Sequence, residues 1–509
     1  MSSSPSEGRR ARSHRDQGAN SSKRRFDFTT EVPAADSLGS VHFIAIGGAG
    51  MSGVARVMLA RGMTVSGSDA KDSLVLTALA AEGAVVHIGH DASHLATADT
   101  VVVSSAIRED NLELLAARSR GLRVLHRSQA LASVMRGSRR VAVAGTNGKT
   151  TTTSMLTVAL QACGVDPSFA VGGELAKHGT NAHLGTGDIF VAEADESDGS
   201  FLVYRPEVAI VTSVQPDHLD FYGTFEAVQA AYAEFAATVQ PTGLLVACAD
   251  DPGSRVLAEV AAVAGTRVMT YGMAADADVR LTAPGGSGFH GHGDLVHAGM
   301  VLGSLDIGMP GRHNLLNATA AFAAATEGLG QDPGRVLEGL AGFTGTRRRF
   351  EPKGEVAGVR VVDDYAHNPG KVAAVVETAR GLAAPGRLIV VFQPHLYSRT
   401  RDFAADLATA LSPADIVIVM DVYAAREDPM PGVSGALIAD QIVGAAQPRG
   451  EHVRFVPFWS DVAPYVAQVA REGDLVLTVG AGDVTMIGPE ILRLLGHRAD
   501  ATKAAQGQK

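Results

Sequence analysis

The chain has 509 residues, enough for about three domains of ordinary size. Its 44 Lys and Arg against 54 Asp and Glu give a formal net charge of −10, which argues against a nucleic-acid partner held by a general positive field. The two cysteines, Cys163 and Cys248, are too few for a disulfide framework or a four-cysteine zinc site. No stretch reaches the roughly 18 uninterrupted apolar residues of a membrane span. We therefore expect a soluble, cytoplasmic protein.

Both ends of the chain are polar. Residues 1–37 begin "MSSSPSEGRRARSHRDQ", which is rich in Ser and Arg and has no apolar core. This composition predicts a disordered basic extension rather than a secretory signal, and binding to an acidic partner is the alternative. Residues 498–509 are predicted to form a disordered tail.

The first block, residues 38–138, opens with "SVHFIAIGGAGMSGVARVMLARGMTVSGSD". This reads as a strand, a glycine-rich turn, a helix and a second strand. Gly48, Gly50 and Gly53 have the spacing that lets a backbone approach a diphosphate at a helix N-terminus, and Asp69 stands where a ribose hydroxyl would lie. The pattern predicts a diphosphate ligand, either a dinucleotide or a UDP-sugar. Tight packing of helix on strand is the alternative.

The second block, residues 139–346, begins with the strand "VAVAG", which leads into "GTNGKTTTT" and an apparent helix. Successive backbone N–H groups in such a loop can surround a β-phosphate. Lys149 could reach the β- and γ-oxygens, and Thr150 could bind Mg²⁺. The loop departs from the standard spacing, because Val143 stands where the first glycine is expected.

Acidic residues follow two further apolar strands of this block. Glu193 and Asp195 end "DIFVAEAD", and Asp217 and His218 follow "VAIVTSV". Carboxyl ends of strands are where open α/β sheets place ligands. A carboxylate and an imidazole near a polyphosphate predict a second divalent ion, although a structural histidine is the alternative for His218.

The third block, residues 347–497, begins with three consecutive arginines in "GTRRRFE". The run Arg347–Arg349 lies at a domain junction, from which an arginine could reach a nucleotide bound next door. His395, Arg399 and Arg401 follow a later strand in "FQPHLYSRTR", where cations suit an anionic substrate.

Strands alternate with helical stretches in all three blocks. This predicts an α/β protein of three domains: a Rossmann-like N-terminal domain, a central P-loop ATP-binding domain with a mostly parallel sheet, and a C-terminal Rossmann-like α/β domain. Residues 277–310 are predicted to form a small antiparallel patch, and "GRHNLLNATAAFAAATEGLG" a helix that ends at a glycine.

The order of the motifs resembles the Mur ligases, and most closely the branch that adds alanine to UDP-N-acetylmuramate. "GTNGKT" is typical of the whole family, whereas "EADESDGSFL" and "FQPHLYSRTR" are narrower. Further matching motifs are "AIGGAGMSG", "VTSVQPDHLD", "GRHNLLNA", "TRRRFE", "DDYAHNP" and "DVYAAREDP". Together the matches span roughly Val41 to Gly488.

The resemblance implies a role for each matching residue. The residues implied at ATP are Gly145, Thr146, Asn147, Gly148, Lys149, Thr150, Thr151, Asn314, Asn317, Arg349 and Asp364. Those implied at the UDP-sugar are Gly48, Ala49, Gly50, Met51, Gly53, Asp69, Ser104 and Ser105. Those implied at the amino acid and substrate are Tyr365, His367, His395 and Arg399. Magnesium ligands are implied to be Thr150, Glu193 and His218, and the catalytic residues Lys149, His218 and Arg349.

The resemblance also implies a reaction. An ATP-dependent ligase would join the lactoyl carboxylate of UDP-N-acetylmuramate to L-alanine through an acyl phosphate, with Mg²⁺ as cofactor, in peptidoglycan precursor synthesis. A monomer or a homodimer is expected. Four residues depart from the branch's usual pattern, which leaves the amino-acid contacts open: Asn147, Ala366, Asn368 and Leu396.

Three alternatives are weighed against this reaction. A ligase of the same build could join a ready-made peptide to UDP-N-acetylmuramate. A nicotinamide oxidoreductase would use the glycines from Gly48 to Gly53 but leaves the Lys149 loop unexplained. A non-catalytic nucleotide sensor is disfavoured because Lys149, Glu193 and His218 occur together.

Overall fold

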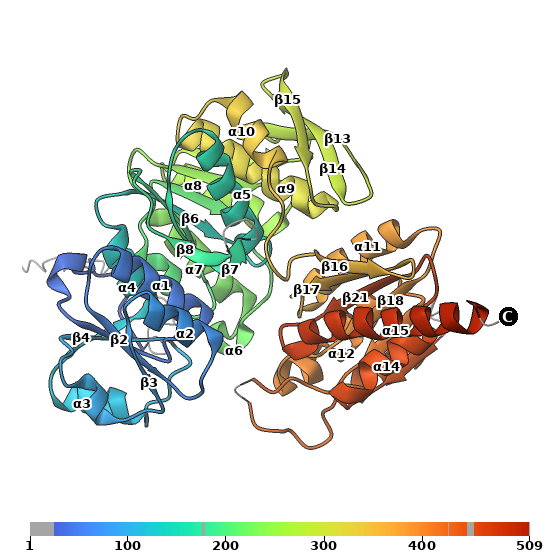
Figure 1. The fold of residues 1–509 in the computed structure, drawn as a ribbon. Coiled ribbons are helices and arrows are strands. Elements are labelled where there is room, and N and C mark those ends of the chain that lie inside the picture. Colours follow the sequence, from blue (N-terminus) through green and yellow to red (C-terminus); the bar gives the residue numbers. More distant parts are fainter. Residues whose placement is uncertain (1–24, 176–178, 426, 445–451, 508–509) are drawn as a thin grey trace, which may run out of the picture.

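A computed structural model describes residues 25–175, 179–425, 427–444 and 452–507 of the chain. The chain forms three lobes, each built on its own sheet, which meet around a common centre (Figure 1). This arrangement confirms the predicted three-domain α/β fold class. None of the helices in these ranges has the length and apolarity needed to cross a bilayer.

The N-terminal sheet has five parallel strands in the order β3-β2-β1-β4-β5. Its strands are β1 (Val41–Ile44), β2 (Val65–Asp69), β3 (Val85–Ile88), β4 (Thr100–Val103) and β5 (Arg123–His126). Its helices are α1 (Ala49–Ala60), α2 (Leu74–Ala81), α3 (Leu112–Ser119) and α4 (Arg127–Met135). The order reverses between β1 and β4, so the carboxyl ends of these two strands open a crevice of the kind that binds nucleotides.

The central sheet has ten strands in the order β15-β14-β13-β12-β11-β10-β6-β9-β7-β8. Its strands are β6 (Arg139–Ala144), β7 (Ser168–Leu175), β8 (Thr180–His183), β9 (Ile189–Glu193), β10 (Val208–Val211), β11 (Leu244–Cys248), β12 (Val268–Gly272), β13 (Val279–Ser287), β14 (His290–His297) and β15 (Met300–Ile307). Its helices are α5 (Lys149–Ala162), α6 (Leu219–Tyr222), α7 (Phe225–Ala237), α8 (Pro252–Val263), α9 (Arg312–Ala323) and α10 (Pro333–Ala341).

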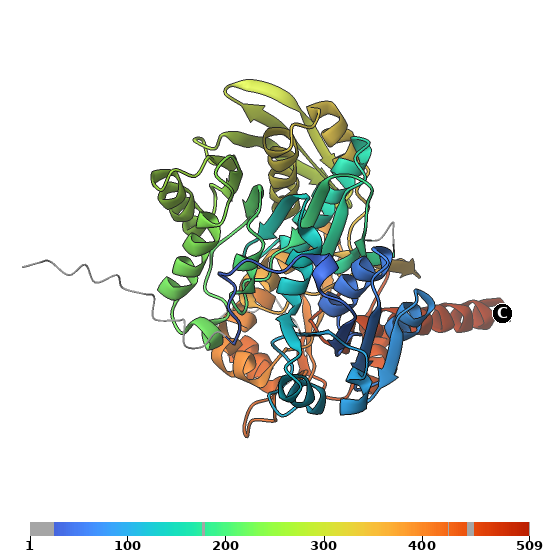
Figure 2. The same cartoon turned by 90° about the vertical axis from the view of Figure 1, so that its left-hand side faces the viewer.

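Strands β6 and β9 to β12 run parallel, whereas β13, β14 and β15 form the expected antiparallel patch. This patch lies at the outer end of the central lobe (Figures 1 and 2), and the ring of Phe289, in the turn between β13 and β14, lies 6.2 Å from that of Phe350. Helix α9 continues through a π-helical turn at Ala324–Gly328, and Gly330 follows with φ of 71°.

The C-terminal sheet has six strands in the order β16-β17-β21-β18-β19-β20, and only β16 is antiparallel to its neighbour. Its strands are β16 (Glu351–Val356), β17 (Val359–Asp364), β18 (Leu388–Phe392), β19 (Ile416–Val419), β20 (His452–Phe455) and β21 (Leu475–Val479). Its helices are α11 (Pro369–Ala383), α12 (Tyr397–Leu411), α13 (Ala436–Gly444), α14 (Trp459–Val469) and α15 (Ile487–Gly507).

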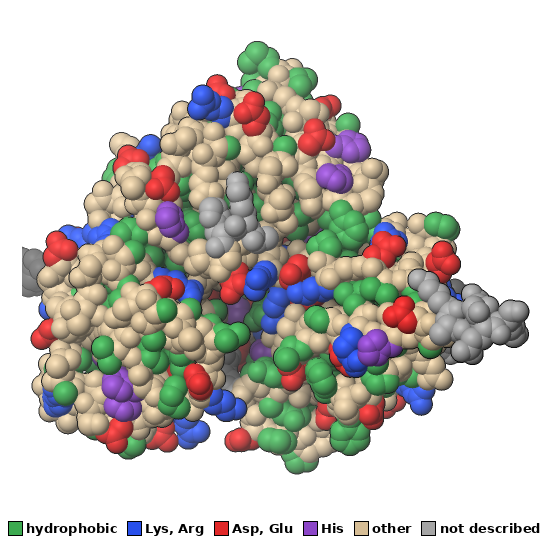
Figure 3. Space-filling view, in the orientation of Figure 1, with side chains coloured by type: hydrophobic (Ala, Val, Ile, Leu, Met, Phe, Trp, Pro, Cys, Tyr) green, Lys and Arg blue, Asp and Glu red, His purple; other side chains and the backbone are tan. Residues whose placement is uncertain are grey.

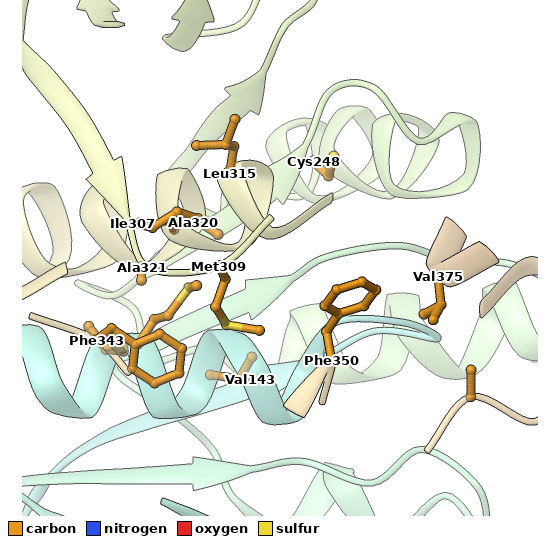
Figure 4. Packing of buried hydrophobic residues seen from close by; sticks show 14 of the residues in the cluster. Val143, Cys248, Ile307, Met309, Leu315, Ala320, Ala321, Phe343, Phe350 and Val375 are labelled. Atoms are coloured by element: carbon orange, nitrogen blue, oxygen red, sulfur yellow. The ribbon is translucent and has the colours of Figure 1, made fainter. Parts of the chain in front are cut away.

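One apolar core extends from the central sheet into the C-terminal domain. Val143 in β6 and Met309 belong to the same cluster of buried side chains as Phe350 and Val375 of α11. Figure 4 shows Phe350 between the central-domain residues and Val375. Because Phe350 is only 3% exposed, its burial helps hold the two domains together.

Two segments at the ends differ from the predicted disorder. Phe28, Val32 and Ala35 are buried in the core of the N-terminal domain, so the last part of the predicted extension packs on that domain. Helix α15 continues to Gly507 and projects from the C-terminal lobe (Figure 2). Residues 1–24 and 508–509 lie outside the described residues.

Candidate active site

A cavity of about 1190 Å³ lies where the three domains meet. It is lined by the glycine loop before α1, the loop before α5, the carboxyl ends of central strands and the first turn of α11. Lys and Arg side chains gather in the hollow between the lobes (Figure 3). Clefts between domains are common ligand sites, and this one presents positive charge to its ligand.

The loop before α5 resolves the anomalous spacing of the motif. Val143 is an interior residue of β6, paired with Ile210 and Glu193 and fully buried, so a flexible residue has no use there. The turn falls instead at Gly145, with φ of 137°, and at Gly148, with φ of 81°. A Cβ on Gly145 would lie 2.0 Å from Thr212 Oγ1, so this position requires glycine.

Lys149 is the first residue of α5 and its side chain is 14% exposed. Its Nζ donates to the carbonyl oxygen of Gly145 at 2.6 Å and lies 2.8 and 2.7 Å from the two carboxylate oxygens of Glu196. Burial alone would lower the pKa of Lys149, but Glu196 and Asp195 outweigh it and raise the pKa. The Lys149 ammonium is therefore charged, and its bond to Gly145 holds it beside the loop that precedes α5.

Thr150 connects the loop to two other elements. Its hydroxyl donates to Glu193 Oε1 at 3.1 Å, and Arg349 donates from Nη2 to the same hydroxyl oxygen at 3.0 Å. Glu193 Oε2 accepts from the backbone N–H of Gly172 at 2.7 Å. The guanidinium of Arg349 also lies 4.9 Å from the ring centroid of Tyr365. Side chains from the central domain and from the junction with the C-terminal domain thus meet at one hydroxyl.

His218 follows β10 with its backbone in the left-handed region, at φ of 54°. Such a conformation is strained for a non-glycine residue and clusters at functional sites. Its Nε2 lies 3.8 Å from Glu196 Oε1. The neighbouring Asp217 accepts from Asn368 Nδ2 at 3.0 Å and lies 3.5 Å from Arg399. Burial opposes ionisation of Asp217, but the charges of His218, Lys371 and Arg399 lower its pKa.

The predicted magnesium ligands are Thr150, Glu193 and His218, and the first two are in contact. Thr150 and Glu193 present two oxygen atoms 3.1 Å apart, and oxygen is the donor that Mg²⁺ prefers. Across the described ranges, no group of three or more His, Cys, Asp or Glu side chains is arranged to hold a metal ion. Two oxygen donors alone would leave the other positions of an octahedral ion to phosphate oxygens and water.

The residues expected near adenine and ribose line the cavity. Asn314 donates to the carbonyl oxygen of Pro310 at 2.7 Å, and a Cβ on Gly148 would lie 2.4 Å from Asn317 Oδ1. Both carboxylate oxygens of Asp364 accept from backbone N–H groups, those of Phe350 and Ala366. Burial raises the pKa of Asp364 despite these bonds and the nearby Arg349.

The glycine loop of the N-terminal domain lines the cavity with Gly50 and Gly53, and some of its residues also make structural contacts. Asp69 accepts from the N–H of Gly47 at 3.0 Å and does not line the cavity, so it fixes the loop. A Cβ on Gly53 would lie 3.3 Å from Ala182 Cβ in β8, so this glycine lets the two domains pack closely. Met51 is 3% exposed, in the core of the domain.

Some of the other residues predicted to contact the UDP-sugar line the cavity, and some do not. Ala49 and Gly50 line the cavity, whereas Gly48 and Ser104 do not. Ser105 is also outside the lining, and its hydroxyl is hydrogen-bonded to the carboxylate of Asp198.

The three consecutive arginines point in different directions. Arg347 pairs with Glu174 at 2.9 Å, and Arg348 donates to the carbonyl oxygens of Gly480 and Gly482. Only Arg349 reaches the α5 loop. The charges of Arg347 and Arg348 have protein partners elsewhere, so Arg349 is the residue of this run that lies where an arginine could reach a nucleotide.

Three of the C-terminal residues expected at the substrate, Tyr365, His367 and His395, lie close to one another at the cavity. Tyr365 and His367 line it, and the ring of His367 lies 5.5 Å from that of His395. His395 stacks on Tyr423 with 6.0 Å between centroids. His395 and Arg399 are outside the lining, so they support its edge rather than form its wall.

Comparison with known proteins agrees with this geometry. Three family descriptions match in order along the chain: "Mur ligase family, catalytic domain" at residues 40–139, "Mur ligase middle domain" at 143–325 and "Mur ligase, glutamate ligase domain" at 348–482. A UDP-N-acetylmuramate–L-alanine ligase from Kineococcus radiotolerans is 57% identical over 472 residues, which cover 92% of this chain and 98% of the relative.

The chain belongs to the Mur ligase family.

Solved structures of other Mur ligases have the same fold. UDP-N-acetylmuramate-alanine ligase MurC from Thermotoga maritima is 28% identical, with a TM-score of 0.75 over 91% of this chain and 99% of that one. A murein peptide ligase from Psychrobacter arcticus is 25% identical, with a TM-score of 0.66 over 90% and 99%. The likeness thus extends over all three domains of this Mur ligase.

Three residues in or beside the cavity of this Mur ligase are not among those that the sequence predicts. Glu196 is 2% exposed and holds Lys149. Arg127, at the start of α4, lies over Gly50, where a Cβ would be 2.2 Å from its Nη1, and pairs with Asp195 at 3.2 Å. Lys371 lies in the first turn of α11. Nothing in local spacing marks these residues, because distant segments bring them together.

Proposed function

We propose that this Mur ligase joins the lactoyl carboxylate of UDP-N-acetylmuramate to L-alanine and converts ATP to ADP and phosphate, as a step in peptidoglycan precursor synthesis. The carrying observation is the meeting of Lys149, Glu193 and Arg349 in one interdomain cavity. The full-length similarity to ligases named for this reaction supports the choice of substrates. The reaction belongs in the cytoplasm, where ATP is made available to it.

Each domain supplies one part of the site in this proposal. The crevice at β1 and β4 takes the UDP part, with Ala49 and Gly50 at the diphosphate and Arg127 as a cation above the loop. The α5 loop, from Gly145 to Thr151, takes the ATP phosphates, with Asn314 and Asn317 on the adenine side and Asp364 at the ribose. The aromatic edge near Tyr365 and His367 receives the amino acid.

The first chemical step brings two anions together. A lactoyl carboxylate oxygen attacks the γ-phosphorus, the bond to the bridging oxygen of ADP breaks, and an acyl phosphate forms. Lys149 and Arg349 reach this point from different domains, so their charges can offset the repulsion as it develops. Glu196 keeps the Lys149 ammonium oriented along the loop until phosphate oxygens compete for it.

The second step forms the amide. The neutral amine of L-alanine attacks the acyl carbonyl, the nitrogen gives up one proton to water or to the departing phosphate, the C–O bond to phosphate breaks, and inorganic phosphate leaves. Thr150, Glu193 and His218 are the residues proposed to hold Mg²⁺, which supplies neutralisation of phosphate charge when bound. The walls from three domains exclude water, which would otherwise hydrolyse the acyl phosphate.

The proposal is tested by phosphate release with UDP-N-acetylmuramate, ATP and a panel of amines. We expect release that requires all three substrates and is fastest with L-alanine, slower with glycine or L-serine. A tripeptide that outcompetes L-alanine would assign the enzyme to peptide reuse instead. NAD(P)-dependent turnover, or nucleotide binding without turnover, would contradict the proposal altogether.

A further inference from the structure

Lys371 lines the cavity but has no part in the mechanism derived above. Lys371 is the third residue of α11, a helix capped by Asn368, whose side-chain oxygen accepts from the N–H of Lys371 at 2.9 Å. The same Asn368 donates to Asp217 of the central domain at 3.0 Å. Lys371 is thus fixed on the C-terminal domain, at the place where that domain contacts the central one.

The side chain of Lys371 differs from the other cleft cations in its partners. Lys149 is held by Glu196, and Arg349 by the Thr150 hydroxyl and the Tyr365 ring. In the part of the chain that the structure describes, the Nζ of Lys371 has no hydrogen bond and no ion pair with protein. It lines the cavity and is only partly exposed.

The charged groups that face Lys371 come from four other elements. Lys149 and Arg349 repel it, whereas Asp217 and Glu196 attract it. Both acids already have partners, Asp217 in Asn368 and Arg399, and Glu196 in Lys149. Burial and the charge of Lys149 lower the pKa of Lys371 to about 8, which outweighs the two acids. A half-buried ammonium in such surroundings is stabilised by an anion that enters the cavity.

We propose that Lys371 binds an oxyanion of the reacting groups from the C-terminal side, as a third cation beside Lys149 and Arg349. This inference rests on the proposed function, which brings two oxyanions to the cavity: the γ-phosphate of ATP and the lactoyl carboxylate of UDP-N-acetylmuramate. Lys371 forms no covalent bond and keeps its proton throughout. It neutralises charge as the carboxylate and the phosphoryl group approach.

The two oxyanion sources can be separated by ligand pairs of which one member carries the group with the oxyanion and the other lacks that group. The β,γ-imido analogue of ATP carries a γ-phosphate and ADP does not, and UDP-N-acetylmuramate carries a carboxylate that UDP-N-acetylglucosamine lacks. Dissociation constants for all four are measured by calorimetry in the wild type, Lys371→Met and Lys371→Arg. We expect Lys371→Met to lose tenfold or more of the preference within one pair, since a charge-assisted hydrogen bond is lost. The pair affected identifies the oxyanion.

Two further results are expected if the inference is right. Lys371→Arg should restore most of the lost preference, because it keeps the charge, and kcat of Lys371→Met should fall with KM for L-alanine little changed. Lys71→Met, an exposed lysine outside the cavity, is the matched control and should behave as the wild type. If Lys371→Met does not fold, Lys371→Gln replaces it, with thermal melting as the check on folding.

The inference is overturned if folded Lys371→Met keeps both preferences and kcat at wild-type values. It is equally overturned if Lys371→Arg is as impaired as Lys371→Met, because the role is then one of shape. A wild type that binds neither UDP-N-acetylmuramate nor the ATP analogue contradicts the proposed function itself, whatever Lys371 does.

Discussion

Lys149 shows how much of the chemistry depends on one side chain. It is the first residue of α5, and Glu196 and Asp195 outweigh the effect of burial and raise its pKa. Arg349 has the complementary role, because it reaches Thr150 from the start of the C-terminal domain. Lys149 and Arg349 are 200 residues apart in the sequence, yet both side chains contact the segment from Gly145 to Thr150.

Substitution of Lys149 should separate phosphate chemistry from sugar binding. Lys149→Ala is expected to lower L-alanine-dependent ADP release by about a hundredfold to a thousandfold, since the loss of a transition-state charge contact costs roughly 3–4 kcal/mol. UDP-N-acetylmuramate should still bind within about threefold of wild type, because its crevice is in another domain. Steady-state kinetics and calorimetry measure the two effects. Loss of both together would contradict the division of roles between domains.

His218 is predicted to act on magnesium rather than on a proton. His218→Ala should raise the Mg²⁺ concentration needed for half-maximal activity by about tenfold or more, as expected when one ligand of a weakly held ion is removed. The titration is compared with that of His183→Ala, an exposed histidine in β8. An unchanged magnesium curve would remove His218 from the ion's surroundings.

At the scale of elements, the strand–loop–helix at β6 and α5 was predictable because its signal is local. An apolar run, glycines and a helical stretch are adjacent in sequence. Val143 occupies the position of the motif's first glycine because it belongs to the strand β6 and not to the loop. Strands β7 and β8 were not predicted, because their pairing skips from Ala170 to Leu175 across an irregular register. The role of Glu196 could not be predicted either, because its hydrogen-bond partner, Lys149, lies 47 residues away in the sequence.

The buried Glu113 of α3 stabilises the N-terminal domain in a pH-dependent way. Burial alone would raise its pKa, but the imidazole of His42, 3.6 Å away, and hydrogen bonds from Ser68, His94 and His90 outweigh it and lower the pKa to about 2. An acid with a lowered folded-state pKa stabilises the fold above its unfolded value of about 4.3, and this stability is lost as pH falls towards 2. The contribution is roughly 3 kcal/mol at neutral pH.

This contribution is testable by acid unfolding. Glu113→Gln should flatten the fall in unfolding free energy between pH 4.5 and 2 while lowering stability at pH 7. Circular dichroism with urea titration at several pH values gives both quantities. The control is Glu109→Gln, an acid near α3 whose side chain is 59% exposed. Equal pH slopes for Glu113→Gln and wild type would contradict the assignment.

At the scale of the whole molecule, the cavity exists because three domains are held against one another. Arg56 of α1 donates to Asn181 of β8 at 3.0 Å, and Asp217 contacts Asn368 and Arg399 across the other interface. Phe350 adds an apolar contact within the shared core. Charged contacts of this kind can break and reform, so they suit a site that must admit substrates and release product.

Removal of Asp217 should loosen the C-terminal domain. Asp217→Ala leaves Arg399 and Asn368 without their shared acceptor, and we expect a larger radius of gyration in solution scattering together with about a tenfold lower kcat. Asp402→Ala, which removes an exposed pair with Arg401, is the control and should change neither. A compact Asp217→Ala enzyme with normal kcat would show that this contact does not govern closure.

The central claim is that the cavity transfers the γ-phosphoryl group of ATP to the carboxylate of UDP-N-acetylmuramate before L-alanine attacks. The most direct measurement uses UDP-N-acetylmuramate with ¹⁸O in both carboxylate oxygens, and mass spectrometry of the phosphate released with L-alanine. An acyl phosphate predicts one ¹⁸O atom in each inorganic phosphate and one retained in the amide. Phosphate that contains only ¹⁶O, with amide still formed, would contradict the account.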